Sequence, residues 1–342
     1  MESKDNVSRD NVSSGRRCLY LGIDAGQTHM EAALVSEAGE VLAQGAGGPS
    51  HVQGANMGEV FRRSLLSALG SMSWNSGCCA PHIVSVGVGV SGLGIPGKRQ
   101  AVLGALRQLF PSATVHMDND AVVHHWGAAG SDDGASILAG TGTIAYGEYK
   151  GVSCRLGGFG YLFGDEGGGF WIGSLAIRRA IRAAEGRAPA TALTKVIEDY
   201  FDVEDVRKIP GLLYSRNAID VKQIAELAPL VCAEAKKGDE TAREIVVGAG
   251  EELGGLAVDL LKKLNVPYDA FYPVYRLGGI WKAGDLLNVS FMRKVNEVYP
   301  NVVWATPRYT PAVGAALMAR SKNVTNVTSS EIQEAKRSDG GK

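Results

Sequence analysis

Two apolar segments of this chain each end at a turn built from glycine. The first, Leu19–Thr28, reads LYLGIDAGQT, and its strand-forming residues stop at Asp24. The second, Ala135–Ala139, is followed at once by the residues 140–143, which read GTGT. The backbone N–H groups of such turns can bind a phosphate, and Asp24 can hold water on a Mg²⁺ ion. An ordinary Asp-Gly turn would explain the first segment alone, but its recurrence favours a phosphate site in two parts.

The residues that follow each turn repeat the same order of elements. Alternating and β-branched patterns predict three-strand meanders at 19–24, 30–36 and 41–45, and again at 135–139, 143–149 and 152–156. Further strands are expected at 83–90, 114–117, 270–277 and 302–305, and helices at 55–69, 97–109, 170–185, 190–200, 223–236, 239–264 and 311–320. A duplicated α/β layout of this kind predicts a ligand site between the halves.

Length and charge narrow the class of protein. A chain of 342 residues suits two domains, expected at 17–127 and 128–322, the second with a helical insertion. Residues 1–16 and 323–342 are polar and are expected to be flexible tails. The net charge of −1 gives no electrostatic reason to expect nucleic acid or an anionic membrane as partner.

The cysteines and the N-terminal sequence indicate a cytoplasmic protein. Five cysteines occur without a CxxC spacing, which disfavours a zinc site and fits reduced thiols. The first 17 residues lack the apolar stretch of a secretory signal. No apolar run reaches the length of a membrane span.

Asp120 is the first candidate for chemistry beyond the turns. It comes just after a predicted strand, where a helix begins. At such a position a carboxylate often caps backbone N–H groups, and the neighbours Asp118 and Asn119 could do the same. The alternative is a general base, because transfer of a phosphoryl group to a hydroxyl needs a group that accepts the hydroxyl proton. The sequence leaves both roles open.

The segment 156–169, LGGFGYLFGDEGGG, is the densest in glycine. Such a loop loses much conformational entropy on folding, which chains tolerate where a ligand or another backbone comes close. Asp165 and Glu166 suit the start of the next helix. They could instead accept hydrogen bonds from the hydroxyls of a sugar, whose apolar face would pack on Phe159 or Trp171.

The histidines show no metal-ligand spacing. His124 and His125 point about 100° apart on a helix, so both are expected to be surface or packing residues. His51 differs, because it follows a Gly-Pro-Ser turn that faces the predicted ligand site. A P-loop motif is absent from the sequence, and the string 87–92, GVGVSG, lies inside a predicted strand, which disfavours a dinucleotide site.

An ordered set of motifs resembles the N-acetylglucosamine kinase group, which also contains ATPase activators of the benzoyl-CoA reductase type. The motifs are GIDAGQT, GVGVSGLG, DNDA, LAGTGT, RLGGFGYLFGDEGGGFWIG and LGGIWKAG. The resemblance covers about residues 18–320. It implies an α/β fold of two ribonuclease-H-like domains, as in actin-like ATPases, around a central cleft that holds ATP, Mg²⁺ and a sugar.

The resemblance also implies roles for matching positions. Asp120 would be the catalytic base for the sugar 6-hydroxyl, and Asp24 would act on Mg²⁺ through a water molecule. ATP and its phosphates would contact Asp24, Gly26, Gln27, Thr28, Thr141, Gly142, Thr143, Gly278 and Gly279. The sugar would contact His51, Asp120, Thr141, Gly158, Phe159, Gly160 and Asp165.

Departures from the family pattern leave the sugar open. His51 stands where relatives often have Asn, and Phe159 where they often have Trp; Gln27 and His29 alter the first turn. The expected activity is ATP-dependent phosphorylation of N-acetylglucosamine or glucosamine at the 6-hydroxyl. Alternatives are a kinase of another hexose, an ATPase activator of a reductase or dehydratase, and a sugar-sensing regulator. The activator would need cluster-binding cysteines, for which Cys154 and Cys232 are the candidates in the second half. A homodimer is left open.

Overall fold

The computed structural model describes residues 18–26, 28–49, 56–72, 82–130, 132–213 and 218–323. Two residues of the predicted site, Gln27 and His51, lie outside these ranges. The predicted tail 1–16 lies outside them as well, together with all but the first residue of the tail 323–342.

The N-terminal half is a five-stranded mixed sheet in the order β3-β2-β1-β4-β5. β1 pairs antiparallel with β2 and parallel with β4, and β4 pairs parallel with β5. Strands β1 and β4 are rich in apolar residues because both of their faces are covered. The elements are β1 Cys18–Ala25, β2 Met30–Ser36, β3 Val41–Gly47, α1 Met57–Gly70, β4 His82–Val90, α2 Lys98–Leu109, β5 Thr114–Asn119 and α3 Asp120–Ala129.

The C-terminal half repeats this order of strands. Its sheet is β10-β9-β6-β7-β8, so that β6, β7 and β8 form the second meander. The elements are β6 Gly134–Ala139, β7 Thr143–Tyr149, β8 Val152–Gly157, α4 Gly169–Ala184, α5 Leu193–Phe201, η1 Val206–Lys208, α6 Ile209–Leu213, α7 Val221–Ala225, α8 Ala228–Lys237, α9 Glu240–Lys263, β9 Pro273–Leu277, η2 Gly279–Ala283, α10 Asp285–Asn296 and β10 Val303–Ala305. The duplicated α/β fold expected from the sequence is confirmed.

One helix expected from the sequence is divided. The predicted helix 223–236 is two helices, α7 and α8, with a turn at Glu226 and Leu227. α7 is closed at its start by a capping box between Asp220 and Gln223. α8 begins with Pro229 in its first turn. Proline lacks the N–H that would continue the preceding helix and disfavours helical backbone at the residue before it.

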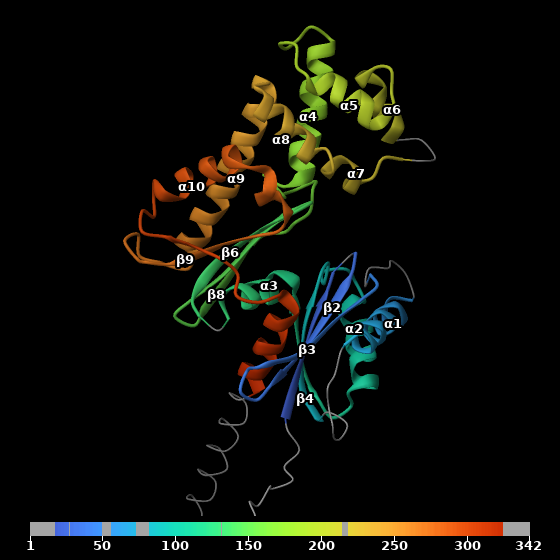
Figure 1. The fold of residues 1–342 in the computed structure, drawn as a ribbon, viewed down its shortest axis with the longest axis vertical. Helices are drawn as coiled ribbons and strands as arrows, with labels where there is room; N and C mark the ends of the chain where they lie inside the picture. Colours follow the sequence, from blue (N-terminus) through green and yellow to red (C-terminus); the bar gives the residue numbers. More distant parts are fainter. Residues whose placement is uncertain are drawn as a thin grey trace, which may run out of the picture.

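A helix over residues 311–323 returns from the second half to the first sheet. A Cβ atom at Gly22 would overlap the carbonyl oxygen of Ala312, and one at Gly87 that of Ala315. The helix backbone therefore lies directly on β1 and β4. In Figure 1 this red helix runs beside α3 and along the blue sheet. The sequence assigned these residues to the second domain, whereas here they complete the first.

α3 joins the two halves. Its apolar residues share one buried cluster with β7 of the second sheet and with the returning helix: Ala121, Val122, Val123, Trp126, Tyr146, Ala315 and Met318. Figure 1 shows α3 between the two sheets. The helix whose first residue is Asp120 is thus held by both halves.

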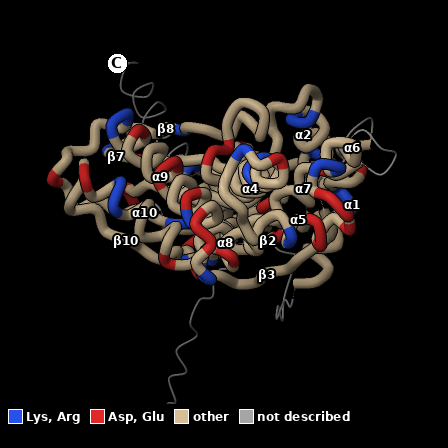
Figure 2. Tube along the Cα trace, turned by 90° about the horizontal axis from the view of Figure 1, so that it is seen from above, with Lys and Arg blue, Asp and Glu red and all other residues tan. Residues whose placement is uncertain are grey.

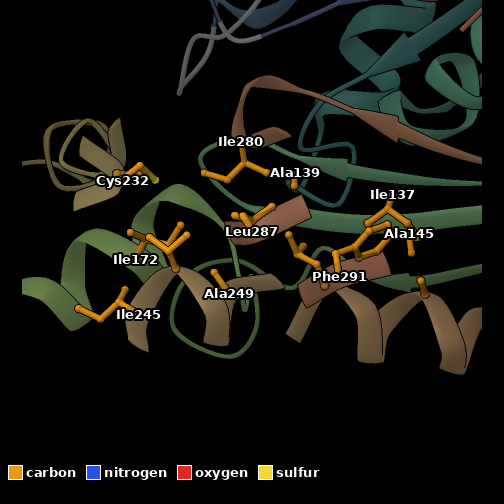
Figure 3. Packing of buried hydrophobic residues seen from close by; sticks show 14 of the residues in the cluster. Ile137, Ala139, Ala145, Ile172, Cys232, Ile245, Ala249, Ile280, Leu287 and Phe291 are labelled. Carbon is orange, nitrogen blue, oxygen red and sulfur yellow. The ribbon is translucent and has the colours of Figure 1, made fainter. Parts of the chain in front are cut away.

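The core of the second half lies between its sheet and the helices α4, α9 and α10. Figure 3 shows Ile137, Ala139 and Ala145 of the sheet near Ile172, Ala249, Leu287 and Phe291 of the helices, all buried. α9 is the longest helix, at 24 residues. Neither α9 nor any other helix in the described ranges combines the length and apolarity needed to cross a membrane.

Figure 2 shows that positions of Lys and Arg and positions of Asp and Glu are interspersed along the chain. Several form exposed ion pairs, such as Lys195 with Asp199 at 2.6 Å and Lys208 with Glu204 at 2.7 Å. Exposed pairs of this kind add little stability. The opposite charges of each pair do cancel much of each other's electric field.

Candidate active site

Asp24 lies buried at the end of β1, with 8% of the residue exposed. Its Oδ2 atom is 3.4 Å from Nε2 of His124. Its Oδ1 atom is also buried, yet it accepts no hydrogen bond from any described residue. A buried carboxylate oxygen without a partner is costly. Such an atom is suited to a water on a metal ion, so Asp24 fits the Mg²⁺ role implied by the sequence.

His124 lies one turn after Asp120 on α3, and the expectation that it is a surface or packing residue is wrong. Burial alone would lower its pKa. The hydrogen bond and charge of Asp24, helped by the charges of Asp120 and Glu31, outweigh burial and raise the pKa of His124. The imidazole is therefore favoured in its charged form between carboxylates. A signal existed in the sequence, because a spacing of four residues puts both side chains on one face of a helix.

Asp120 is the first residue of α3, and the capping role falls mainly to its neighbour. Asn119 is the N-cap, and its side chain accepts from the N–H of Ala121 at 3.0 Å. Oδ1 of Asp120 accepts from the same N–H at 2.9 Å. Its Oδ2 accepts no hydrogen bond among the described residues. One oxygen of Asp120 thus supports the helix while the other is free for a ligand, so the two roles left open by the sequence are compatible.

Lys98, the first residue of α2, is a second residue that the sequence analysis missed. Only 2% of it is exposed, and its Nζ donates to the carbonyl oxygen of Ser91 at 2.6 Å. Burial lowers the pKa of Lys98, and the charge of Asp120 works in the opposite direction. No sequence pattern predicts that a lysine at the start of an amphipathic helix points inward here.

The second glycine turn is closed by its own backbone and by α4. Gly140 donates its N–H to the carbonyl of Gly142 at 2.9 Å. The first N–H groups of α4, those of Gly169 and Phe170, donate to the carbonyls of Gly140 and Thr141 at 2.8 and 3.0 Å. The turn that sequence analysis assigned to phosphate is therefore held in one shape by the start of a helix.

Asp165 fastens this turn from the other side. Its Oδ1 accepts from the N–H of Thr143 at 3.1 Å, and a Cβ at Gly142 would collide with its carboxylate. Burial raises the pKa of Asp165, the Thr143 N–H lowers it, and nearby Glu166 raises it. The hydroxyl of Thr143 donates to the carbonyl of Glu166 at 3.1 Å. Thr143 is thus a buried structural residue, and its hydroxyl already has a partner.

Three of the predicted sugar residues, Gly158, Phe159 and Gly160, lie on a loop with exposed apolar side chains. Gly158 and Gly160 have positive φ angles of 73° and 85°, which glycine adopts without strain. Between them Phe159 is 70% exposed, and the nearby Leu162 and Phe163 are 71% and 83% exposed. No hydrogen bond or ion pair within the described ranges joins this loop to Asp120. The side chains of Phe159, Leu162 and Phe163 thus lie mainly in solvent.

Gly278 lies next to the second turn. Its φ is 97°, and a Cβ there would overlap the carbonyl oxygen of Ala139. Gly279 has open space around the position of a Cβ. In the first turn Gly26 is also confined, since a Cβ would lie 2.9 Å from the carbonyl oxygen of His29. Thr28 has its Oγ1 3.0 Å from Nδ1 of His29.

Seven of the predicted residues thus form two groups. Asp24 and Asp120 gather at the first sheet, joined by His124. Thr141, Gly142, Thr143, Asp165 and Gly278 gather at the second sheet. Among the described residues, no cluster of three or more histidine, cysteine or acidic side chains could by itself hold a metal ion.

Comparisons with known proteins agree over nearly the whole chain. Residues 21–319 match the model of the BadF/BadG/BcrA/BcrD ATPase family. The chain is 27% identical over 312 residues to N-acetyl-D-glucosamine kinase of Dictyostelium discoideum, covering 88% of this chain and 97% of that protein. It is 28% identical over 308 residues to N-acetylmuramic acid/N-acetylglucosamine kinase of Clostridium acetobutylicum, covering 88% and 98%.

A solved structure extends the agreement to three dimensions. A candidate N-acetylglucosamine kinase from Chromobacterium violaceum superposes with a TM-score of 0.68 at 26% identity, covering 89% of this chain and 99% of that one. The resemblance noted from the motifs is therefore confirmed, and this chain belongs to the BadF/BadG/BcrA/BcrD ATPase family.

Proposed function

We propose that this protein is an ATP-dependent kinase that phosphorylates an amino sugar, N-acetylglucosamine or glucosamine, at the 6-hydroxyl. The observation that carries the proposal is the pair of carboxylates at the first sheet. Asp24 ends β1 and Asp120 follows β5, and both strands run parallel to β4 between them. Each carboxylate keeps one oxygen without a partner in the described part of the chain. The relatives named above act on N-acetylated amino sugars, which supports this substrate class.

Asp120 would act as the general base. As the sugar hydroxyl oxygen forms its bond to the γ-phosphorus, the free oxygen of Asp120 takes the hydroxyl proton, and the bond from that phosphorus to the ADP oxygen breaks. The other oxygen stays on the N–H of Ala121, so the carboxylate is held in place. Positioning the sugar in line with the phosphate would contribute more than the base itself.

Asp24 and the glycine turns would hold the nucleotide. A bound Mg²⁺ ion would neutralise charge on the phosphates, with its water on Oδ1 of Asp24. The turns at Gly26–Thr28 and Thr141–Gly142 would bring backbone N–H groups to the phosphates. Gly278 and Gly279 would leave space for the adenosine, because side chains there would collide with a flat base.

The loop with Gly158, Phe159 and Gly160 would line the sugar site. Phe159 offers an exposed ring to the apolar face of a sugar. Asp165 would contribute through the turn that it fastens. His51 remains part of the proposed sugar site, although it lies outside the described residues.

The cysteines give little support to the alternative function as an ATPase activator. In the described residues the free thiols are Cys18, Cys154 and Cys232. Cys232 is buried, which raises its pKa to about 11, and a buried neutral thiol is a poor ligand for an iron–sulfur cluster. A purified protein with the brown colour of such a cluster would favour the activator.

A panel of hexoses tests the proposal. ADP release is measured with N-acetylglucosamine, glucosamine, N-acetylmuramic acid, glucose and mannose, each with Mg·ATP, and phosphorus NMR locates the phosphate on the product. We expect an amino sugar to give the highest kcat/KM and a 6-phosphate. ADP release that is independent of sugar would instead indicate an ATPase, and a preference for glucose would indicate a hexokinase.

A further inference from the structure

Within the described ranges, His124 is the basic side chain that touches the proposed metal carboxylate, and the proposed chemistry does not use it. Its Nε2 lies 3.4 Å from Oδ2 of Asp24, and the two side chains are only 24% and 12% exposed. The opposite oxygen of the same carboxylate has no partner in the described residues. The contact therefore fixes which oxygen of Asp24 is occupied and which is free.

The surroundings of the contact between His124 and Asp24 include two further carboxylates. Glu31 lies directly opposite Asp24 in the antiparallel register of β1 and β2, so both side chains emerge on the same face of the sheet. Asp120 begins the helix that carries His124. Carboxylates from β1, β2 and α3 thus surround one imidazole, and without it Asp24 would be free to rotate away from its acidic neighbours.

We infer that His124 is a positioning residue that holds Oδ2 of Asp24, so that Oδ1 faces the metal-bound water of the nucleotide. The inference rests on the proposed function. α3 then positions both carboxylates. Asp120, the general base, begins this helix, and His124, which orients Asp24, follows one helical turn later. A shift of α3 would therefore move both together.

Binding of nucleotide with and without metal tests the inference. Calorimetry measures the Kd of the ATP analogue AMPPNP in Mg²⁺ and in EDTA, for the native chain, His124→Ala and His124→Gln. Loss of a group that orients a metal-linked side chain typically costs 10–100-fold in metal affinity. We expect His124→Ala to raise the Kd in Mg²⁺ on the order of tenfold and to leave the Kd in EDTA unchanged. Glutamine can donate from a similar point, so His124→Gln should recover most of the loss.

A double-mutant cycle separates positioning from a merely structural role. In an Asp24→Asn background the His124→Ala effect on the Mg²⁺-dependent Kd should largely disappear. An equal loss in that background, or an equal loss in EDTA, would overturn the inference. Melting temperatures of all variants report folding. If His124→Ala does not fold, His124→Gln and its cycle with Asp24→Asn decide in the same way. His82→Ala, at the exposed start of β4, controls for loss of a histidine.

The outcome is distinguishable from failure of the proposed function. If the native chain binds Mg·AMPPNP but phosphorylates no amino sugar, the kinase proposal fails while the His124 result still stands. If the native chain phosphorylates the sugar and the His124 variants bind nucleotide as it does, only the inference fails.

Discussion

The two sheets share one strand order, but the residues at the ends of their strands differ in chemical character. The ends of the first sheet carry charged groups, Asp24 and Asp120, with His124 beside them. The ends of the second carry Gly142 and Gly278, positions at which a Cβ would collide with neighbouring atoms. The two copies of this strand arrangement therefore have different tasks in the proposed site. The first half supplies fixed charges for the chemical step, and the second supplies close backbone approach. Substitutions in the first half should lower kcat, and those in the second should lower stability or affinity.

Asp120→Asn should give the largest effect. The amide keeps an oxygen for the N–H of Ala121, but it cannot accept the hydroxyl proton. We expect kcat to fall by roughly 10²–10⁴-fold, with little change in the Kd of ATP or sugar. Asp118→Asn is the control, because Asp118 serves only the N–H of Asn119 in the described contacts. Turnover near the native rate in Asp120→Asn would remove this residue from the role of base.

Gly278→Ala tests whether the second half needs glycine where its backbone comes close to other atoms. The left-handed backbone at Gly278 (φ 97°) and the overlap with Ala139 make a side chain costly. We expect a loss of about 2–4 kcal/mol in the free energy of unfolding, measured with urea. Gly279→Ala has open space and should leave that stability nearly unchanged. Equal stability of the two variants would contradict a specific requirement for glycine at 278.

The junction of the halves should make stability sensitive to acid. His125 on α3 has its Nδ1 2.9 Å from the hydroxyl of Ser136 on β6, and burial lowers its pKa from 6.5 to about 4. The unfolded chain therefore takes up a proton near pH 6.5, whereas the folded chain does so only near pH 4. The stability from neutral His125 is complete above pH 6.5 and is lost as the pH falls toward 4, by up to about 3 kcal/mol.

Urea unfolding of the native chain and of His125→Asn, at a series of pH values from about 7.5 to about 4.5, measures this loss. We expect a shallower pH dependence in His125→Asn, because asparagine does not titrate. His82→Asn, exposed at the far end of the sheet, should keep the native slope. A His125→Asn slope equal to that of the native chain would assign the acid sensitivity to other groups.

Phe159→Ala should give the smallest effect and concerns recognition only. Because the ring is 70% exposed, the melting temperature should not change. Loss of a stacking surface should raise the KM for the sugar a few-fold, about 0.5–1.5 kcal/mol, without altering the KM for ATP. Phe163→Ala, with 83% exposure, is the matched control. Equal changes in both variants would show that the loop acts through general apolarity and not through Phe159.

Local patterns predicted the elements well, and long-range contacts explain what they missed. β2 and β7 begin and end at the predicted residues because alternation and turns are local signals. The contact of His124 with Asp24 depends on how α3 packs across the end of β1, which no local pattern encodes. The same holds for the buried ammonium of Lys98. The hydrogen bond between Asp165 and Thr143, which lies 22 residues earlier, is also beyond a local pattern. The contact of Asp165 with a sugar stays a prediction.

The returning helix has a consequence for synthesis of the chain. The strands at Gly22 and Gly87 are among the first to leave the ribosome, but the helix that covers them is made almost last. Until translation is nearly finished, the part of this face at Gly22 and Gly87 lacks the helix that covers it, and contacts this distant in sequence form slowly. The strands and helices of the second half follow one another in the sequence, so this half can fold first. The first half can then complete its fold against it. A nascent chain stalled before residue 311 should therefore recruit chaperones through its N-terminal strands.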